Sequence, residues 1–363
     1  MLQRISRFID TMPLADNGIK IDAALISSQT NRLYFSGFKS SDGLVFILRG
    51  QAYLLVDFRY YELALKTVSG LKVVLVDTFS ETLKSLIRHH KINGILLENE
   101  SLTLKKADLF QKIFESVGAT EIRNDTLDNI ILDMRKIKTP DEIKRIGNAQ
   151  KISELSFNYI LTKIKNGARE CDLALDLEFF MRKNGATCVA FDLIVISGKN
   201  TSMPHGVPTM KQIEDGDFIT IDMGAVFEGY NSDMTRTVAL GHVSDKQKSV
   251  YNTVLQAQML TLSNVKAGVS CYELDKIARD VIDKSPYKGT FGHALGHGVG
   301  LEVHEIPVIS LKNEELLEDS MVITVEPGIY LKNEFGVRIE DMVVVEKNGC
   351  HNLTNISKDL IIL

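Results

Sequence analysis

Residues 213–224, IEDGDFITIDMG, are echoed farther along the chain by LEDSMVITVEPG at 317–328, and this echo decides the fold of the C-terminal part. Five of the twelve positions are identical, and three more pair Ile with Leu, Ile with Val and Asp with Glu. Upstream of each copy, residues 166–183 and 266–284 read as a glycine-containing turn that enters an amphipathic helix. Two blocks in the same order predict an α+β domain with an internal pseudo-twofold repeat, whose two half-sheets face each other across a crevice.

The echo also aligns acidic residues. It pairs Asp222 with Glu326, and each is followed by a second acid, Asp233 or Glu340, at a similar distance beyond a turn. In a hairpin, residues equally far from the turn are cross-strand neighbours with Cβ atoms roughly 5 Å apart. Each half is therefore expected to present two facing carboxylates.

Acids on strands are often no more than solvated side chains, and any one of the four alone favours that interpretation. Their recurrence at matched positions of a repeat weakens it. Four carboxylates in an otherwise apolar crevice would repel one another, raise their own pKa values and destabilise the fold unless cations were present. Two divalent ions balance four carboxylates, which suggests a dinuclear metal centre.

The N-terminal part has a different pattern. Apolar runs at 22–27, 43–48, 52–58, 73–77 and 94–98 predict buried strands, and helical patterns at 60–68, 79–90 and 104–117 alternate with them. This alternation is typical of an α/β domain. Thr139, Pro140 and Glu142 form a capping-box helix start. The expected organisation is an α/β domain over 1–125, a linker over 126–138 and the repeat-containing domain over 139–363.

Composition excludes several classes. The 363 residues carry 42 Lys and Arg against 47 Asp and Glu, and a net charge of −5 disfavours a generic nucleic-acid binder. No apolar run approaches the roughly 18 residues that span a bilayer, and the first residues have helical spacing rather than the pattern of a secretory leader. The four cysteines are scattered without a CxxC pair. A soluble cytoplasmic protein, with no membrane or nucleic-acid partner, is the expectation.

Four histidines lie in glycine-rich or proline-bounded segments of the C-terminal part. FGHALGHGVGLEVHEIP (291–307) contains His293, His297 and His304, and MPHGVP (203–208) contains His205. A single histidine in such a place is more often a core residue than a ligand. Beside four acids, however, at least one is expected to bind metal and others to donate protons. An oxygen-rich set with one imidazole suits manganese, cobalt or iron better than structural zinc.

These motifs together resemble a known family. The blocks PHGVPT, IDMGAVFEGYNSDMTRT, GHGVGLEVHEIP, TVEPGIY and GVRIED are similar to the signature blocks of the pita-bread metallopeptidases, and most similar to the Xaa-Pro peptidases, prolidase and aminopeptidase P. LISSQTNRLYFSGFKSSDG (25–43) and LLVDFRYYELA (54–64) resemble that family's creatinase-like N-terminal domain. The likeness covers nearly the whole chain.

The resemblance implies a set of site residues. The implied metal ligands are Asp222, Asp233, His297, Glu326 and Glu340, and the residues implied around the substrate are His205, His293, His304, Tyr330 and Arg338. Asp233 and Glu340 would bridge two ions, Asp222 would chelate one, and His297 and Glu326 would complete the other. The catalytic candidates are Glu326 as proton shuttle, with His304 and His205 donating hydrogen bonds to the substrate carbonyl or oxyanion.

The implied reaction is hydrolysis of the bond between an N-terminal residue and proline, by attack of a hydroxide held between two divalent ions. Manganese is the favoured ion, with cobalt, iron or zinc open, and a homodimer acting on proline-containing di- or oligopeptides is implied. Dipeptidase and longer-peptide aminopeptidase activity are not distinguished. The alternatives are a methionine-aminopeptidase-like enzyme, a catalytically inactive pita-bread binding module, and a metal-free creatinase, which the intact acids disfavour.

Overall fold

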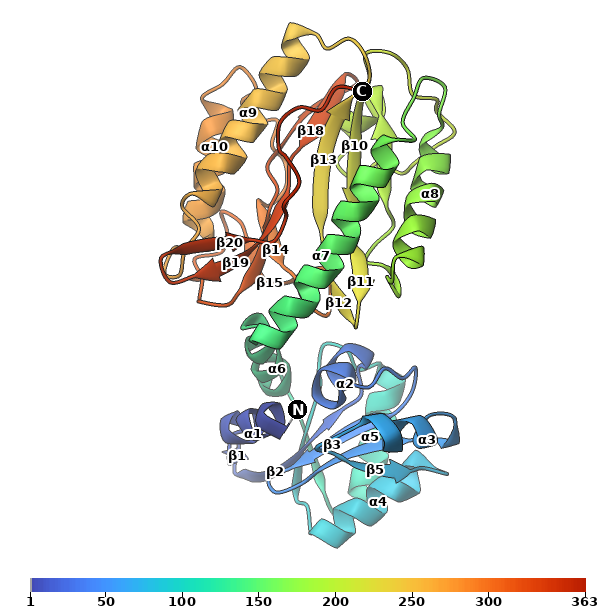
Figure 1. The fold of residues 1–363 in the computed structure, drawn as a ribbon. Coiled ribbons are helices and arrows are strands. Elements are labelled where there is room, and N and C mark those ends of the chain that lie inside the picture. Colours follow the sequence, from blue (N-terminus) through green and yellow to red (C-terminus); the bar gives the residue numbers. More distant parts are fainter. Residues whose placement is uncertain (1) are drawn as a thin grey trace. The chain divides into compact units, whose positions relative to one another are not determined.

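The computed structural model describes residues 2–363, and the chain divides between Arg135 and Lys136 into two compact units (Figure 1). The segment 126–138, expected to link the domains, is mostly the helix α6 (Thr126–Lys136), and the division falls inside it. Among the described residues, no helix combines the length and the apolar character needed to cross a membrane.

The first unit is built on one mixed sheet of seven strands in the order β5-β4-β3-β2-β6-β7, with β1 paired to β2. Its strands are β1 (Ala15–Asp16), β2 (Ile19–Ile26), β3 (Leu44–Leu48), β4 (Ala52–Val56), β5 (Lys72–Leu75), β6 (Gly94–Leu97) and β7 (Thr120–Arg123). Its other helices are α1 (Leu2–Thr11), α2 (Gln29–Ser36), α3 (Phe58–Thr67), α4 (Phe79–His90) and α5 (Leu104–Glu115). The buried sheet residues Phe46 and Ile95 share one apolar cluster with Leu83 of α4 and Phe114 of α5, so the expected α/β architecture is confirmed.

The second unit contains four long helices and several small antiparallel sheets. The helices are α7 (Pro140–Leu161), α8 (Glu170–Lys183), α9 (Asp245–Leu262) and α10 (Cys271–Asp283), with a 3₁₀ helix, η1 (Gly198–Ser202). The strands are β8 (Cys188–Val189), β9 (Ile194–Ser197), β10 (Phe218–Met223), β11 (Ala225–Phe227), β12 (Tyr230–Asn231), β13 (Met234–Ala239), β14 (Gly296–Gly298), β15 (Glu305–Ile309), β16 (Val322–Val325), β17 (Gly328–Leu331), β18 (Phe335–Arg338), β19 (Asp341–Glu346) and β20 (Gly349–Asn352).

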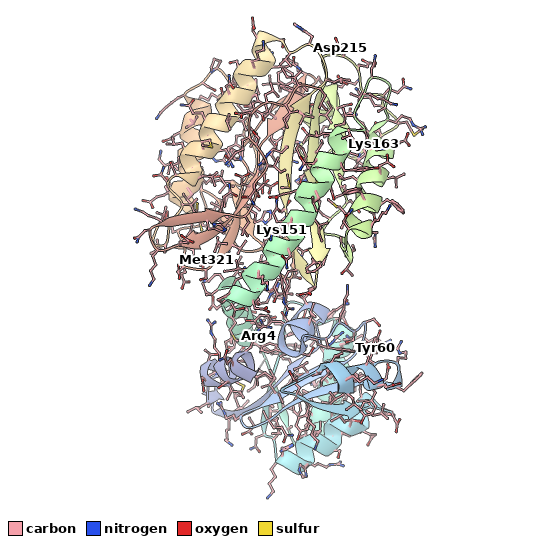
Figure 2. All side chains as sticks on the ribbon, viewed as in Figure 1. Arg4, Tyr60, Lys151, Lys163, Asp215 and Met321 are labelled. Carbon is pink, nitrogen blue, oxygen red and sulfur yellow. The ribbon has the colours of Figure 1, made fainter. Side chains whose placement is uncertain are left out.

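The capping box predicted at the start of α7 is present. Thr139 accepts a hydrogen bond from the Glu142 backbone N–H, and the Glu142 carboxylate accepts one from the Thr139 backbone in return. Along α7, Lys151 is exposed and labelled on the helix in Figure 2, whereas the neighbouring Ile152 is buried in an apolar cluster. The helix therefore has one polar face and one core face.

The internal repeat is confirmed by matched backbone contacts. Gly167 N–H donates to Ile213 C=O at 2.9 Å in the first half, and Gly268 N–H donates to Leu317 C=O at 2.8 Å in the second. The antiparallel bridges Arg169–Gln212 and Ser270–Leu316 also correspond. Figure 1 shows the strands lying between the α7–α8 pair and the α9–α10 pair.

Each half has an apolar core of its own. In the first half, Leu173 of α8 and Ile219 of β10 belong to one buried cluster. In the second half, Leu274 of α10 and Ile323 of β16 belong to another. In both copies the echoed segment therefore forms a strand in the core of its half, and the acid near the end of that strand is held by a fixed backbone.

The first hairpin differs from its expected register. Asp222 pairs with Thr235, and the ladder continues to Met223 opposite Met234, so Asp233 faces Gly224 and is diagonal to Asp222. The cause is the tight turn at Glu228 and Gly229, both with positive φ, which fixes the pairing of the strands on either side. The prediction that Asp222 and Asp233 lie directly opposite each other was therefore wrong by two residues.

The second hairpin has the expected register. Val325 lies opposite Asp341, so Glu326 and Glu340 are the next pair along the two strands. The ladder resumes beyond them with Gly328 opposite Arg338.

Candidate metal centre

Three of the predicted ligands form a compact cluster. Asp233, His297 and Glu340 each offer one ligand atom, and these atoms all lie within 4.8 Å of one another. Asp233 comes from the first half of the repeat, while His297 and Glu340 come from the second. The cluster is therefore assembled across the seam between the two halves.

Glycines allow His297 to reach this position. It lies in the short strand β14 between Gly296 and Gly298, which pairs with β15 and β16 on its two sides. A Cβ atom at Gly296 would collide with the backbone carbonyl of Thr324, and one at Gly298 would collide with that of Ile306. Only glycine permits such close backbone approach on both flanks.

Glu326 and Asp222 lie beside this cluster. His297 Nε2 is 3.3 Å from Glu326 Oε1 and 3.7 Å from Asp233 Oδ2. Asp222 is near enough for its charge to raise the pKa values of both Asp233 and Glu340. The structure thus brings together all five side chains that the sequence singled out.

Burial and mutual repulsion dominate the electrostatics of the acids. Burial, followed by the charge of Glu340, raises the pKa of Asp233 well above its usual range. Burial, followed by the charges of Glu326 and Asp222, does the same to the pKa of Glu340. Without cations, these two carboxyls are held toward their protonated forms.

Glu326 and His297 behave as an ion pair. Burial opposes the charge on Glu326, but the hydrogen bond and charge of His297 hold the pKa of this carboxyl below its usual value. Burial likewise opposes a charged His297, yet Glu326 raises the pKa of that imidazole. Glu326 is therefore the member of the set that most readily stays a carboxylate.

The donor set fits divalent cations. Asp222 Oδ1 is buried and has no hydrogen-bond partner, although its other oxygen accepts a 2.6 Å bond from Arg338. An unpaired buried carboxylate oxygen is costly, and a cation would satisfy it. Four carboxylates with one imidazole are suitable ligands for hard or borderline divalent ions.

The tautomer of His297 also suits metal binding. Its Nδ1 lies 3.0 Å from the Gly298 carbonyl oxygen, which can only accept, so Nδ1 carries the proton in the neutral ring. Nε2 is then left with its lone pair directed at the acids. A backbone carbonyl that fixes the second nitrogen in this way is usual for metal-binding histidines.

Two threonines support the acids, and the sequence reasoning missed both. Thr235 Oγ1 donates to Glu340 Oε2 at 2.7 Å and accepts from Arg338 Nε at 3.1 Å. Thr324 Oγ1 donates to Glu326 Oε1 at 3.2 Å and accepts from the backbone N–H of His297. Thr324 stands in the echo itself, two residues before Glu326, so its place in the repeat was a usable signal.

Arg338, which is buried, forms a hydrogen-bonded chain with the partly buried Tyr330 and His293 beside Asp222. Arg338 donates to Asp222 and, at 2.9 Å, to the Tyr330 hydroxyl. That hydroxyl is 2.9 Å from His293 Nε2, and His293 Nδ1 faces the Ala294 carbonyl. Tyr330 therefore accepts from Arg338 and donates to a neutral His293, whose pKa is lowered by burial.

His304 and His205 lie at the exposed side of the cluster. The ring of His304 meets that of His297 edge to face at 4.3 Å between centroids. Burial, followed by the charge of His297, lowers the pKa of His304. His205 is close enough to lower the pKa values of His293 and His304, and both His205 and His304 are exposed.

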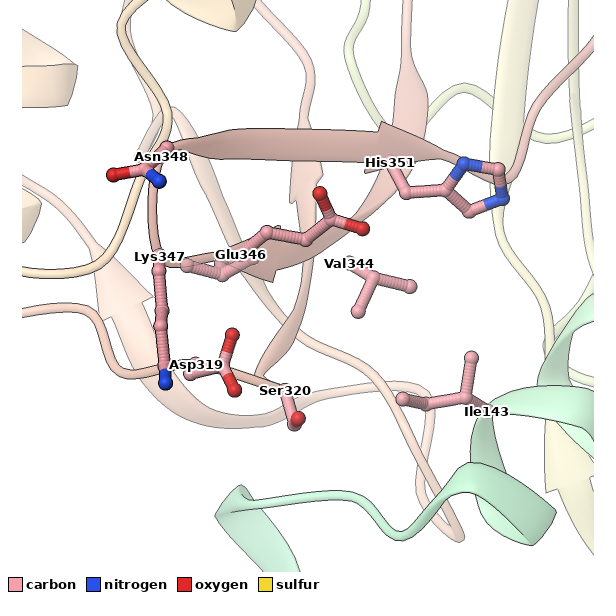
Figure 3. Close-up of a pocket in the computed structure, with 9 residues that line it drawn as sticks. Ile143, Asp319, Ser320, Val344, Glu346, Lys347, Asn348 and His351 are labelled. Carbon is pink, nitrogen blue, oxygen red and sulfur yellow. The ribbon is translucent and has the colours of Figure 1, made fainter.

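A cavity of about 500 Å³ lies elsewhere in this unit, beside the β19–β20 hairpin (Figure 3). It is lined by Ile143, Asp319, Ser320, Val344, Val345, Glu346, Lys347, Asn348 and His351. None of these is among the predicted site residues. The candidate metal centre is therefore not in this cavity.

Two family models match this chain. Residues 144–347 match the model of metallopeptidase family M24, and residues 4–137 match that of the creatinase/prolidase N-terminal domain. The Xaa-Pro dipeptidase of Pyrococcus furiosus is 38% identical over 99% of both chains.

Solved structures give the same result. An Xaa-Pro dipeptidase from Bacillus anthracis matches with a TM-score of 0.93 at 38% identity, covering 99% of both chains. An X-Pro aminopeptidase from Thermotoga maritima matches with a TM-score of 0.90 at 40% identity, covering 94% of this chain and 98% of that one. The expected pita-bread fold with a creatinase-like N-terminal domain is confirmed, and the chain is a metallopeptidase that belongs to family M24.

Proposed function

We propose that this chain is a two-metal exopeptidase that hydrolyses the bond between an N-terminal residue and proline. The observation that carries the proposal is the convergence of four carboxylates from two half-sheets around one imidazole, with Asp222 Oδ1 buried and unpaired. The dipeptidase and aminopeptidase names of the relatives support the Xaa-Pro specificity.

The assignment of residues to the two ions is the one that the family resemblance implies. Asp233 and Glu340, one from each half, would bridge two ions; Asp222 would hold one of them, and His297 with Glu326 the other. Manganese is the favoured ion, and cobalt, iron or zinc would also accept this donor set. When bound, such ions lower the pKa of water and polarise a peptide carbonyl.

Glu326 is proposed to move the proton. Without cations, His297 holds the pKa of this carboxyl below its usual value, and the Thr324 hydroxyl donates to one of its oxygens. With His297 bound to an ion, the positive charge of the ions would keep Glu326 ionised instead. A carboxylate in this state can take a proton from the attacking water and return it to the leaving proline nitrogen. That nitrogen needs the proton because proline, once released, is an amine.

The exposed imidazoles are proposed to bind the substrate. His304 and His205 lie beside the ligands with their rings open to solvent, so either can donate a hydrogen bond to a substrate carbonyl or to the developing oxyanion. Tyr330 and His293 are proposed to line the site through the chain that starts at Arg338.

The test is hydrolysis by metal-stripped protein before and after addition of manganese, with an Xaa-Pro dipeptide, an Xaa-Pro-Yaa tripeptide and a methionine-initiated peptide without proline. The proposal expects manganese to restore cleavage of a proline peptide, and the preferred length then separates dipeptidase from aminopeptidase. Cleavage of the methionine peptide alone would favour the methionine-aminopeptidase alternative. If manganese restores no cleavage, cobalt, iron and zinc are added in turn, and no cleavage with any of them would favour a binding module.

A further inference from the structure

The segment that carries His205 is poorly held by apolar contacts. Residues 198–208 connect β9 to Thr209, and within them only Thr201 and Gly206 are buried. The large apolar side chains Met203 and Val207 are 49% and 74% exposed. Something other than a hydrophobic core must therefore keep this loop, defined here as the His205 loop, in place.

One buried carboxylate binds both ends of the His205 loop. Glu170, the first residue of α8, is fully buried. At the start of the loop it accepts from Ser197 N–H at 2.6 Å, Ser197 Oγ at 2.9 Å and Asn200 Nδ2 at 3.1 Å. At the far end it accepts from Thr209 N–H at 3.0 Å and Thr209 Oγ1 at 2.7 Å. The loop is thus closed at its base by a single side chain.

The contacts of Glu170 suit a carboxylate that acts as an acceptor on both oxygens. Backbone N–H and amide NH₂ groups can only donate, so the Glu170 oxygens act as acceptors. A buried carboxylate is tolerated when several such bonds satisfy it, and each bond is stronger because the acceptor is charged. Its place in the first turn of α8 adds the favourable field of the helix N-terminus.

The second half of the repeat shows that the fold alone does not require this acid. Glu170 N–H donates to Lys211 C=O, and at the corresponding position Cys271 N–H donates to Glu315 C=O. The same backbone arrangement is therefore built in the second half around a buried cysteine. The half that carries His205 has a carboxylate there instead.

The middle of the loop is hydrogen-bonded to β18, the strand that precedes Glu340. Gly336 N–H donates to Thr201 Oγ1 at 2.9 Å, and Arg338 donates to the Pro204 carbonyl at 3.2 Å. Arg338 also pairs with Asp222. The same guanidinium therefore fixes the position of Pro204, the neighbour of His205, relative to a predicted metal ligand. The position of His205 then depends on Glu170 at the base of the loop and on Arg338 at its centre.

From these contacts, we propose that Glu170 is a positioning residue for substrate binding: it fixes the His205 loop so that His205 faces the substrate side of the metal centre. The inference rests on the proposed function, because it takes His205 to contact the substrate. Glu170 itself would touch neither substrate nor metal, and the loop contributes no metal ligand.

The first test is the kinetics of Glu170→Gln. The amide cannot accept at both ends, because its NH₂ group would meet a donor. The expected result is a KM for the proline peptide raised about tenfold, with kcat within about threefold of wild type and unchanged manganese affinity. The matched control is Glu142→Gln, another buried first-turn glutamate, which bonds Thr139 and Tyr230 instead of the loop.

A second test is independent of activity. The chain contains no tryptophan, so Val207→Trp places a single reporter on the loop. Adding Glu170→Gln should raise acrylamide quenching of this tryptophan several-fold and lower its anisotropy, whereas adding Glu142→Gln should change neither. Thr209→Val, an exposed position that loses one loop bond, should give a smaller change in the same direction and covers the case in which Glu170→Gln does not fold.

The proposed peptidase activity and the proposed role of Glu170 can be contradicted separately. Wild-type protein that cleaves no proline peptide contradicts the proposed function, while the fluorescence still decides whether Glu170 orders the loop. Unchanged quenching in Glu170→Gln, or a fall in kcat and metal affinity with KM unaltered, overturns the role of Glu170 even if the peptidase activity is present.

Discussion

The two halves of the catalytic unit share a frame but not a chemistry. Each supplies one acid near the end of a core strand, Asp222 or Glu326, and one before the return strand, Asp233 or Glu340. The other predicted site residues are unevenly shared. His293, His297, His304, Tyr330 and Arg338 all belong to the second half, and the first contributes only His205.

The acids are therefore neutralised in different ways. Glu326 has its partner, His297, within its own half, whereas Asp222 takes Arg338 from the other. The difference teaches that the repeat accounts for the matched carboxylates, whereas most of the side chains around them belong to the second half alone. Changes in the two halves should then give different phenotypes except at the proposed bridging ligands.

The largest expected effect comes from those bridging positions. Asp233→Asn and Glu340→Gln, one in each half, should each lower kcat/KM at least ~1000-fold, a loss of about 4 kcal/mol in transition-state stabilisation. Peptide hydrolysis in manganese-supplemented buffer measures the effect. Exposed Asp280→Asn and Glu334→Gln are the matched controls. A near-normal rate in either variant would contradict equivalent bridging roles for Asp233 and Glu340.

Arg338 should have the next largest effect. Arg338→Met leaves Asp222 buried without its partner, and breaking a buried ion pair costs about 3–5 kcal/mol. A loss of kcat/KM of roughly 100-fold is expected, together with a lower melting temperature. Arg338→Lys keeps the charge but loses the forked guanidinium that also reaches Thr235 and Tyr330. Its kcat/KM should therefore lie between those of wild type and Arg338→Met. Full activity in Arg338→Met would show that the halves are not coupled through this pair.

The two supporting threonines sharpen the comparison. Thr235→Val removes the 2.7 Å bond to Glu340 and should weaken metal binding about 10-fold, the lower end of the range for groups that orient ligands. Thr324→Val removes a longer bond, at 3.2 Å, from Glu326, which also has His297 as a partner. Its effect should be smaller. Competition with a chromophoric chelator measures both, and the reverse order would contradict the assignment of Glu340 as a bridging ligand.

The smallest expected effect concerns stability without metal. Burial and Glu340 raise the pKa of Asp233 in the folded protein, so folding favours its protonated form. The unfolded chain loses that proton near pH 4, and the Asp233 contribution to stability therefore falls as the pH rises from there toward the raised folded pKa. Asp233→Asn cannot ionise and avoids this loss.

Thermal unfolding in chelator checks this expectation. Metal-free wild type and Asp233→Asn should have similar melting temperatures near pH 4, and the variant should be the more stable by about pH 8. Added manganese should reverse the order at the higher pH, since only the wild type has the full ligand set. A variant that is less stable than metal-free wild type at every pH would show that Asp233 is not repelled by its neighbours.

The repeat made much of this arrangement predictable. The echo identified four acids, and the glycine-rich or proline-bounded segments identified four candidate histidines, because both signals are carried by short local segments; only the family resemblance selected His297 among them. The register of the first hairpin was not predictable to one residue. It depends on which two residues occupy the turn, and Glu228 is an unusual residue to adopt positive φ there.

Hydrogen-bond partners that are distant in sequence could not be predicted from local sequence patterns. Glu170 reads locally as an ordinary first-turn acid, and only the folded chain brings residues 197–209 to it. The link between Thr235 and Arg338 likewise joins two strands that are distant in sequence. Such contacts leave no periodic pattern, so physical reasoning about single segments does not find them.

The most direct test of the central claim is the number of divalent ions bound per chain, measured by titration calorimetry with manganese and by elemental analysis after dialysis. The account predicts two ions in the wild type, and loss of tight binding in both Asp233→Asn and Glu340→Gln. A single ion per chain, held equally well when the acid of one half is neutralised, would contradict a centre shared between the two halves.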